Sequence, residues 1–167
     1  MPQAAPFSIS RIFNAPRALV FQVNTKPAHL AHWLSPEGFK SIHTAMDFRV
    51  GGTYHYGLEG PGGMQMWGKQ VFKEIVPNQK IVLVQSFSDK DGGITRHPMS
   101  PAWPAEMLAT TTFEDDGPGK TKVTITWAPY NSDEAGHAAF EGGRPSMKQG
   151  FEGTFAKLDA YLLTLTK

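Results

Sequence analysis

The segment that decides the fold is SMKQGFEGTFAKLDAYL, residues 146–162, near the end of the chain. Side chains that could pack inward recur there every three or four residues, which is the period of one face of an α-helix. Those positions are Met147, Phe151, Thr154, Leu158, Tyr161, Leu162 and Leu165. Ser146 and Gln149 match a capping box, so the pattern predicts a helix from Met147 to about Leu165. Gly150 and Gly153 lower helix stability, and we expect close packing against a neighbour to compensate.

The rest of the chain supplies a sheet for this helix to cover. Alternating or apolar segments bounded by turn residues predict strands at 7–13, 40–50, 53–59, 66–76, 81–88, 106–113 and 121–128. Short helices are predicted at 17–23, 28–34 and 132–141. An antiparallel sheet must cover its apolar face. The order therefore predicts an α+β helix-grip fold, with a curved antiparallel sheet around the C-terminal helix and two short helices after the first strand.

Composition narrows the functional classes. The 167 residues correspond to one domain, 1–167, and Lys+Arg (16) nearly balances Asp+Glu (15). Without a basic run, we expect no nucleic-acid partner and no membrane surface. The chain has no cysteine and no recognisable signal peptide, and its apolar runs are far too short to cross a bilayer. These features predict a cytoplasmic protein.

The hairpin around Gly51-Gly52 can be given a register. A three-residue turn, 50–52, puts apolar residues on one face and polar residues on the other, which a sheet with one buried face requires. The expected pairs are Phe48–Tyr54, Met46–Tyr56 and Thr44–Leu58 on the buried face, and Asp47–His55 and His43–Glu59 on the opposite face.

An unusually long connection, DGGITRHPMSPAWP, joins two predicted strands at residues 91–104. Its glycines provide flexibility at the base, and its three prolines stiffen the remainder. Arg96 and His97 could meet an anionic or carbonyl group, and Met99 and Trp103 could close an apolar mouth. Three interpretations stay open: a loop packed on the protein's own rim by Trp103 with Arg96 in a surface ion pair, a lid that touches ligand, or catalysis by His97.

Several segments together carry a family resemblance. They are ISRIFNAPRALVF, KPAHLAHWL, MDFRVGGTY, WGKQVFKEIVPNQKIVLV and SMKQGFEGTFAKLDAYL. In this order they resemble the START/Bet v 1-like superfamily, specifically proteins grouped with the C-terminal domain of the activator of Hsp90 ATPase. The long loop is similar to one bacterial subgroup of undefined role. One departure is Phe151, where the family usually has Gly-Trp. The resemblance implies the helix-grip fold but not one function, because relatives include lipid carriers, cyclases and a co-chaperone.

Candidate ligand-binding residues combine apolar walls with a few polar groups, as small-molecule pockets do. They are Met46, Phe48, Tyr54, Tyr56, Trp67, Phe87, Arg96, His97, Trp103, Met107, Trp127, Phe151, Phe155 and Leu158. The sequence does not show to which face of the sheet Trp67 points, because the alternation of its strand is ambiguous around Gly68. No catalytic residue, metal ligand or cofactor is assigned, because nucleophile motifs are missing and His29 and His32 have no obvious third ligand.

We therefore expect the protein to bind a small hydrophobic or aromatic molecule between the sheet and the C-terminal helix. One alternative is a cyclase- or hydrolase-type enzyme acting on a polyketide-like ligand, with proton transfer by His97, Arg96 or a pocket tyrosine. A further alternative, activation of an Hsp90-type chaperone ATPase, is suggested by the family resemblance alone. A homodimer through an edge strand or Trp33 would also fit.

Overall fold

A computed structural model describes residues 5–33, 38–96 and 100–166. Its strands are β1 (Phe7–Phe13), β2 (Lys40–Met46), β3 (Thr53–Glu59), β4 (Gln65–Val76), β5 (Lys80–Ser88), β6 (Ile94–Thr95), β7 (Glu106–Asp115) and β8 (Thr121–Pro129). Its helices are α1 (Arg17–Val23), α2 (Pro27–Trp33), the single 3₁₀ turn η1 (Pro61–Gly63), α3 (Glu134–Gly142) and α4 (Arg144–Leu165).

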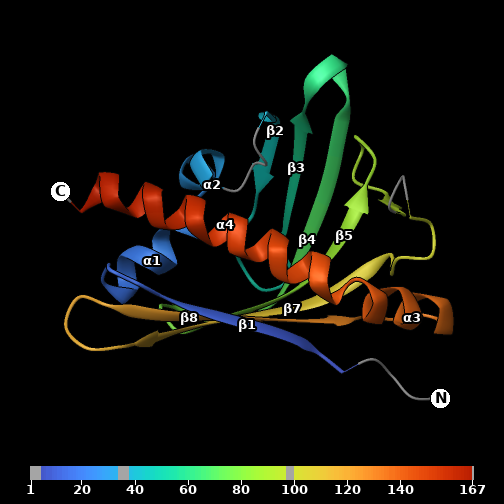
Figure 1. The fold of residues 1–167 in the computed structure, drawn as a ribbon. Helices are drawn as coiled ribbons and strands as arrows, with labels where there is room; N and C mark the ends of the chain where they lie inside the picture. Colours follow the sequence, from blue (N-terminus) through green and yellow to red (C-terminus); the bar gives the residue numbers. More distant parts are fainter. Residues whose placement is uncertain (1–4, 34–37, 97–99, 167) are drawn as a thin grey trace.

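The strands form one antiparallel sheet in the order β1-β8-β7-β5-β4-β3-β2, with the short β6 paired to β5. Figure 1 shows the sheet bent strongly and α4 crossing its hollow face, with α1 and α2 at one end and α3 at the other. The predicted α+β helix-grip arrangement is confirmed. We call the sheet face toward α4 the inner face.

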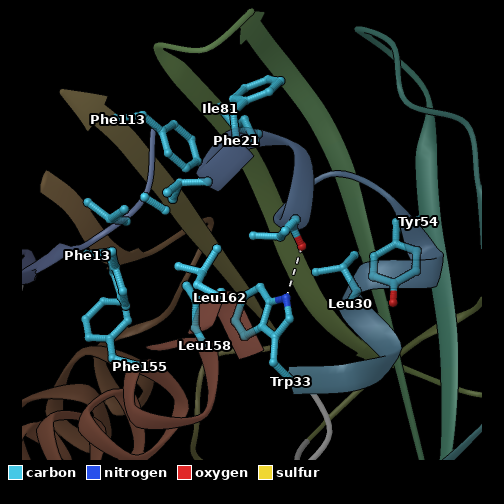
Figure 2. Close-up of a cluster of buried hydrophobic side chains, with 14 of the residues drawn as sticks. Phe13, Phe21, Leu30, Trp33, Tyr54, Ile81, Phe113, Phe155, Leu158 and Leu162 are labelled. Atoms are coloured by element: carbon cyan, nitrogen blue, oxygen red, sulfur yellow. Dashed lines mark hydrogen bonds between the residues drawn. The ribbon is translucent and has the colours of Figure 1, made fainter. Parts of the chain in front are cut away.

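A core cluster anchors α4 to the sheet and to α1 and α2. Figure 2 shows Phe155, Leu158 and Leu162 of α4 among side chains from β1, β7 and the two short helices. Leu158 and Leu162 are 1% and 2% exposed, so this end of the interior is filled. Trp33 belongs to the same cluster and donates its Nε1–H to the carbonyl of Val23 at 3.0 Å. Its ring is therefore buried. A dimer contact through Trp33 would need the ring to lie on the surface.

The β2–β3 register differs from the predicted one by two residues. Met46 pairs with Tyr54 and Thr44 with Tyr56, so β2 ends at Met46 and residues 47–52 form a longer turn. The turn is held by β4, because Gly51 N donates to the Phe72 carbonyl at 2.9 Å and Phe72 N donates to the Gly52 carbonyl at 3.0 Å. A slip of two residues keeps every side chain on its face, so the predicted buried face survived the wrong register.

The polar pairs predicted for this hairpin do not form. Ala45, not Asp47, lies opposite His55, and His43 lies opposite Gly57. Asp47 instead accepts a hydrogen bond from Arg49 Nε at 2.6 Å within the turn.

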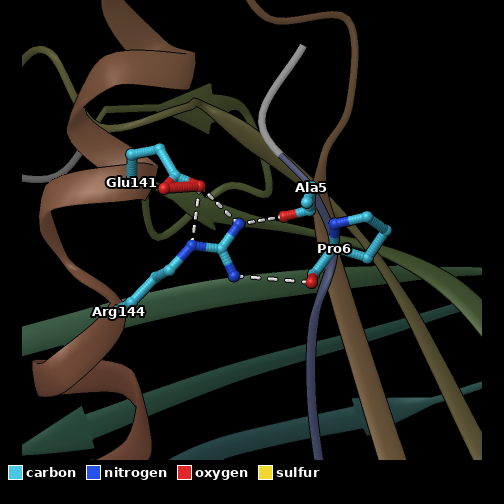
Figure 3. Close-up of polar contacts among 4 residues, drawn as sticks. All are labelled: Ala5, Pro6, Glu141 and Arg144. Atoms are coloured by element: carbon cyan, nitrogen blue, oxygen red, sulfur yellow. Dashed lines mark hydrogen bonds and ion pairs between the residues drawn. The ribbon is translucent and has the colours of Figure 1, made fainter.

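The long helix begins three residues before the predicted start. Gly143 is its N-cap, without a side-chain cap hydrogen bond, so the predicted capping box is absent. Figure 3 shows the contacts at the α3–α4 junction: the Arg144 guanidinium binds the Glu141 carboxylate and the carbonyls of Ala5 and Pro6. These contacts fix the first turn of α4 and tie the segment before β1 to it.

The two glycines inside α4 also differ from expectation. Both are exposed, and a Cβ added at Gly150 or Gly153 would have no neighbour within 4 Å. Close packing at either position was therefore a wrong prediction.

Candidate ligand-binding site

A chamber of about 370 Å³ lies between the inner face and α4. Met46, Phe48, Tyr54 and Tyr56 of the β2–β3 hairpin lie on one side, and Phe151, Phe155 and Leu158 of α4 close the other. Leu30 and Trp33 of α2 close the end near the core cluster. We call this space the inner chamber. Its size and apolar walls are those of small-molecule sites.

A second space of about 570 Å³, here called the outer chamber, lies toward the α3–α4 junction. Trp103, Pro104 and Ala105 of the long connection form one wall, and Gly142, Gly143 and Met147 form another. Four residues line both chambers: Tyr56, Gln85, Phe87 and Trp127. We call these four the neck, because they mark where the two spaces adjoin.

Polar side chains cross the inner face as a band. Tyr54 pairs with Gln70, and Gln70 pairs with Gln85, so the three lie side by side on β3, β4 and β5. Tyr56 lies beside them over Gly68, where an added Cβ would overlap its ring and hydroxyl. Glycine at 68 thus creates the space that the Tyr56 ring occupies.

Both phenols remain protonated at neutral pH. Burial raises the pKa of Tyr56 to about 12, and burial together with the nearby Tyr56 raises the pKa of Tyr54 to about 12. Tyr56 is only half-buried because its ring borders the chambers, yet it lies deep enough for desolvation to act. Each phenol can therefore donate a hydrogen bond but is a poor general base.

No aspartate, glutamate, lysine, arginine or histidine lines either chamber among the residues that the structure describes. The hydrogen-bonding groups on the walls are hydroxyls, carboxamides and indoles. Burying a charge without a partner is unfavourable, so these walls suit an uncharged molecule.

The structure brings most of the predicted residues together. Met46, Phe48, Tyr54, Tyr56, Phe87, Trp127, Phe151, Phe155 and Leu158 line the inner chamber. Trp103 and Met107 line the outer chamber.

Trp67 is placed differently from the prediction. The residue borders the inner chamber, but it pairs with Gly57 and its ring packs with His43 and His55 on the sheet's other face. There the ring stacks on His55 at a centroid distance of 5.4 Å, and a Cβ on Gly57 would come within 2.7 Å of it. The reason is strand parity: Gly68, the next residue, faces inward beneath Tyr56.

Arg96 does not line either chamber. Its Nη1 donates to the carbonyls of Pro101 at 3.1 Å and Trp103 at 3.4 Å, so it closes the long connection on itself. In the first of the three interpretations Arg96 made a surface ion pair, and these two carbonyl contacts take its place. The Trp103 ring packs against Phe140, and a Cβ on Gly143 would lie within 2.7 Å of it. His97 and Met99 lie outside the described residues.

The base of the long connection is also bound to the sheet. Asp89 Oδ1 accepts from the amides of Gly93 and Asp91, and these bonds lower the pKa of Asp89. The Asp89 carbonyl is 3.1 Å from His55 Nε2, and Lys69 Nζ donates to the Gly92 carbonyl at 3.3 Å. The first part of the loop therefore lies against the face opposite α4, and β6 then extends the sheet beside β5.

Sequence reasoning missed Gln70 and Gln85. The signal was available in β5, where Ile81, Leu83, Gln85 and Phe87 alternate in one phase and place a carboxamide among apolar side chains. For Gln70 the same argument failed, because assigning Trp67 to the inner face forces Gln70 outward.

The histidines of α2 are engaged elsewhere. His29 Nδ1 is 2.6 Å from the Tyr161 hydroxyl, and the His32 ring stacks on Tyr161 at 4.9 Å. Within residues 5–33, 38–96 and 100–166, no three potential ligands group in a way that could hold a metal ion. No helix in this part of the chain is long and apolar enough to span a membrane.

The geometry can be compared with known proteins. The family described as Activator of Hsp90 ATPase homolog 1-like protein matches residues 14–163. The chain belongs to this family. The resemblance seen in the sequence is thereby confirmed, and the family's helix-grip fold is the one observed here.

Solved structures of bacterial proteins share this fold. One from Arthrobacter aurescens has a TM-score of 0.76 at 25% identity, covering 96% of this chain and 87% of that one. One from Rhodobacter sphaeroides has a TM-score of 0.75 at 20% identity, covering 100% and 99%. One from Mycobacterium smegmatis has 0.73 at 22%, covering 94% and 90%. No curated protein matches the sequence significantly.

Proposed function

We propose that this member of the family binds a small, uncharged, largely apolar molecule in the inner chamber. The observation that carries the proposal is the chamber itself: about 370 Å³ of space between sheet and α4 whose described lining contains no charged side chain. Aromatic and aliphatic walls favour an apolar or aromatic ligand, and the band of Tyr54, Gln70, Gln85 and Tyr56 offers it neutral hydrogen bonds.

A catalytic role has less support. Acid–base catalysis is most efficient when the pKa of the reacting group lies near the working pH. The ionisable groups among the described lining residues are the two phenols, and their pKa of about 12 is far from that range.

Thermal unfolding with a panel of neutral aromatic compounds, including naphthalene and 2-naphthol, tests the proposal. A ligand at about 100 times its Kd stabilises the folded state by about 2.7 kcal/mol. For a chain of this length this raises Tm by roughly 5–10 °C. If no compound of the panel raises Tm, the proposal is wrong.

Variants with a larger side chain in the wall of the inner chamber test whether the ligand binds there. Ala109 lines the inner chamber and is 5% exposed, so Ala109→Leu should abolish the shift, and the milder Ala109→Val should reduce it. Ala160→Leu makes the same substitution at an exposed position of α4 and should leave the shift unchanged. Equal shifts in all three variants would place the ligand elsewhere.

A further inference from the structure

The neck holds hydrogen-bonding groups that the protein does not use. Tyr56, Gln85 and Trp127 make no side-chain hydrogen bond to another described residue. No fully enclosed side-chain nitrogen or oxygen in the described part of the chain lacks a partner. The polar atoms of these three residues are therefore not fully enclosed, and all three residues line both chambers.

These groups are mainly donors. The Trp127 indole can only donate, and the Gln85 carboxamide offers two N–H groups beside one oxygen. The Tyr56 hydroxyl keeps its proton, because burial raises its pKa to about 12. Each of these donors suits an oxygen atom that accepts hydrogen bonds. A carbonyl oxygen does so without charge.

An anion is a poorer match for the same donors. No arginine, lysine or histidine is among the described lining residues of either chamber. A carboxylate entering the neck would lose its hydration without gaining a cationic partner, which is unfavourable in an apolar site.

Apolar walls extend from the neck in both directions. Phe151 and Phe155 lie on the inner side, and Trp103, Met107 and Met147 lie on the outer side. The two volumes, about 370 and 570 Å³, each have room for a ring-sized group.

We propose that the neck binds the carbonyl oxygen of an uncharged ligand whose two apolar parts extend into the inner and outer chambers. This inference rests on the proposed function, and it adds a ligand class and the outer chamber. Phe87 and the Trp127 ring flank the carbonyl, and the wall of Trp103 and Gly143 covers the outer apolar part.

Three probes of one shape test the role of the carbonyl: benzophenone, benzhydrol and diphenylmethane. They carry two phenyl rings joined by a carbonyl, an alcohol carbon or a methylene group. Calorimetric titration should show benzophenone binding about 5- to 30-fold more tightly than diphenylmethane, the range expected for one or two net hydrogen bonds. Diphenylacetic acid, which carries a carboxylate at the same place, should bind more weakly than benzophenone.

Single substitutions assign the contact. Tyr56→Phe should weaken benzophenone about 3- to 10-fold and leave diphenylmethane unchanged, because it removes only the hydroxyl. Tyr130→Phe is the matched control, since it removes the same hydroxyl from a residue that lines neither chamber. Ala139→Leu narrows the outer chamber alone, so it should weaken benzophenone and not the single-ring-system probe naphthalene.

The outcomes separate this inference from the proposed function. Equal affinity for benzophenone and diphenylmethane in the wild-type protein, unchanged by Tyr56→Phe, would overturn the carbonyl assignment while the binding function stands. Tighter binding of diphenylacetic acid would overturn the requirement for an uncharged ligand. Absence of binding by every probe, naphthalene included, would overturn both proposals.

Discussion

The two glycines in α4 give the sharpest test of the structure. Gly150 and Gly153 lie within the 22-residue helix, and an added Cβ meets nothing within 4 Å at either position. Neither has a positive φ, so alanine fits the existing backbone without strain. Gly150→Ala and Gly153→Ala should therefore each stabilise the fold.

The size of the effect follows from helix propensity. Glycine in a helix interior is about 1 kcal/mol less favourable than alanine, so the double variant should gain roughly 2 kcal/mol. For a chain of this length, this corresponds to an increase in Tm of about 4–8 °C. Urea denaturation should show a higher midpoint with the same slope, because the surface exposed on unfolding barely changes.

A third glycine supplies the opposite expectation. Gly143 caps the same helix, but a Cβ there would lie 2.7 Å from the Trp103 ring, so Gly143→Ala should destabilise the protein. A double variant at 150 and 153 that unfolds at the wild-type urea concentration or below would refute the reasoning. That result would mean that the exposed face of α4 is covered by something, as the sequence had suggested.

Three further predictions concern titration, packing and the N-terminal segment. Raising the pH from 10 toward 12 should destabilise the protein progressively. In the unfolded chain the phenols of Tyr54 and Tyr56 ionise near their ordinary pKa, whereas in the folded protein their pKa is about 12. The free energy of unfolding falls by at most about 1.4 kcal/mol per pH unit for each group. Tyr56→Phe should reduce this slope in urea denaturation series, and an unchanged slope would contradict the shifted pKa. Leu158→Ala should cost about 2–5 kcal/mol, since Leu158 is 1% exposed; a loss well below 1 kcal/mol would show that this part of the core is loose. Arg144→Ala should speed hydrogen exchange at the Phe7 amide, because it releases the carbonyls of Ala5 and Pro6. Lys148→Ala, four residues along the same helix, should leave this exchange unchanged. Equal exchange in both variants would show that these contacts do not hold the segment.

The predicted site residues were correct in strands where apolar and polar side chains alternate clearly. The prediction was wrong in β4, where a glycine interrupts this alternation. The hairpin residues Met46, Tyr54 and Tyr56 reached the inner face despite a wrong register, since a two-residue slip preserves parity. Trp67 did not, because Gly68 carries no side chain that would reveal which way its strand faces. That one error also concealed Gln70.

Local sequence likewise could not determine contacts made between distant segments. The capping box at Ser146 was a reasonable expectation, but the helix begins earlier, at Arg144, whose side chain binds the carbonyls of Ala5 and Pro6, about 139 positions away. In the same way, the β2–β3 turn was set by its hydrogen bonds to Phe72 in the next strand.

The sequence by itself determined the order of strands and helices, the inner face of most strands and the family, because these depend on periodicity and on short-range turn and helix signals. Only the tertiary structure decided where space remains. A chamber exists where side chains from several strands and α4 fail to meet, and this depends on the bend of the whole sheet. The same is true of the neck: Tyr56, Gln85 and Trp127 are far apart in the chain, and only the fold makes all three line both chambers.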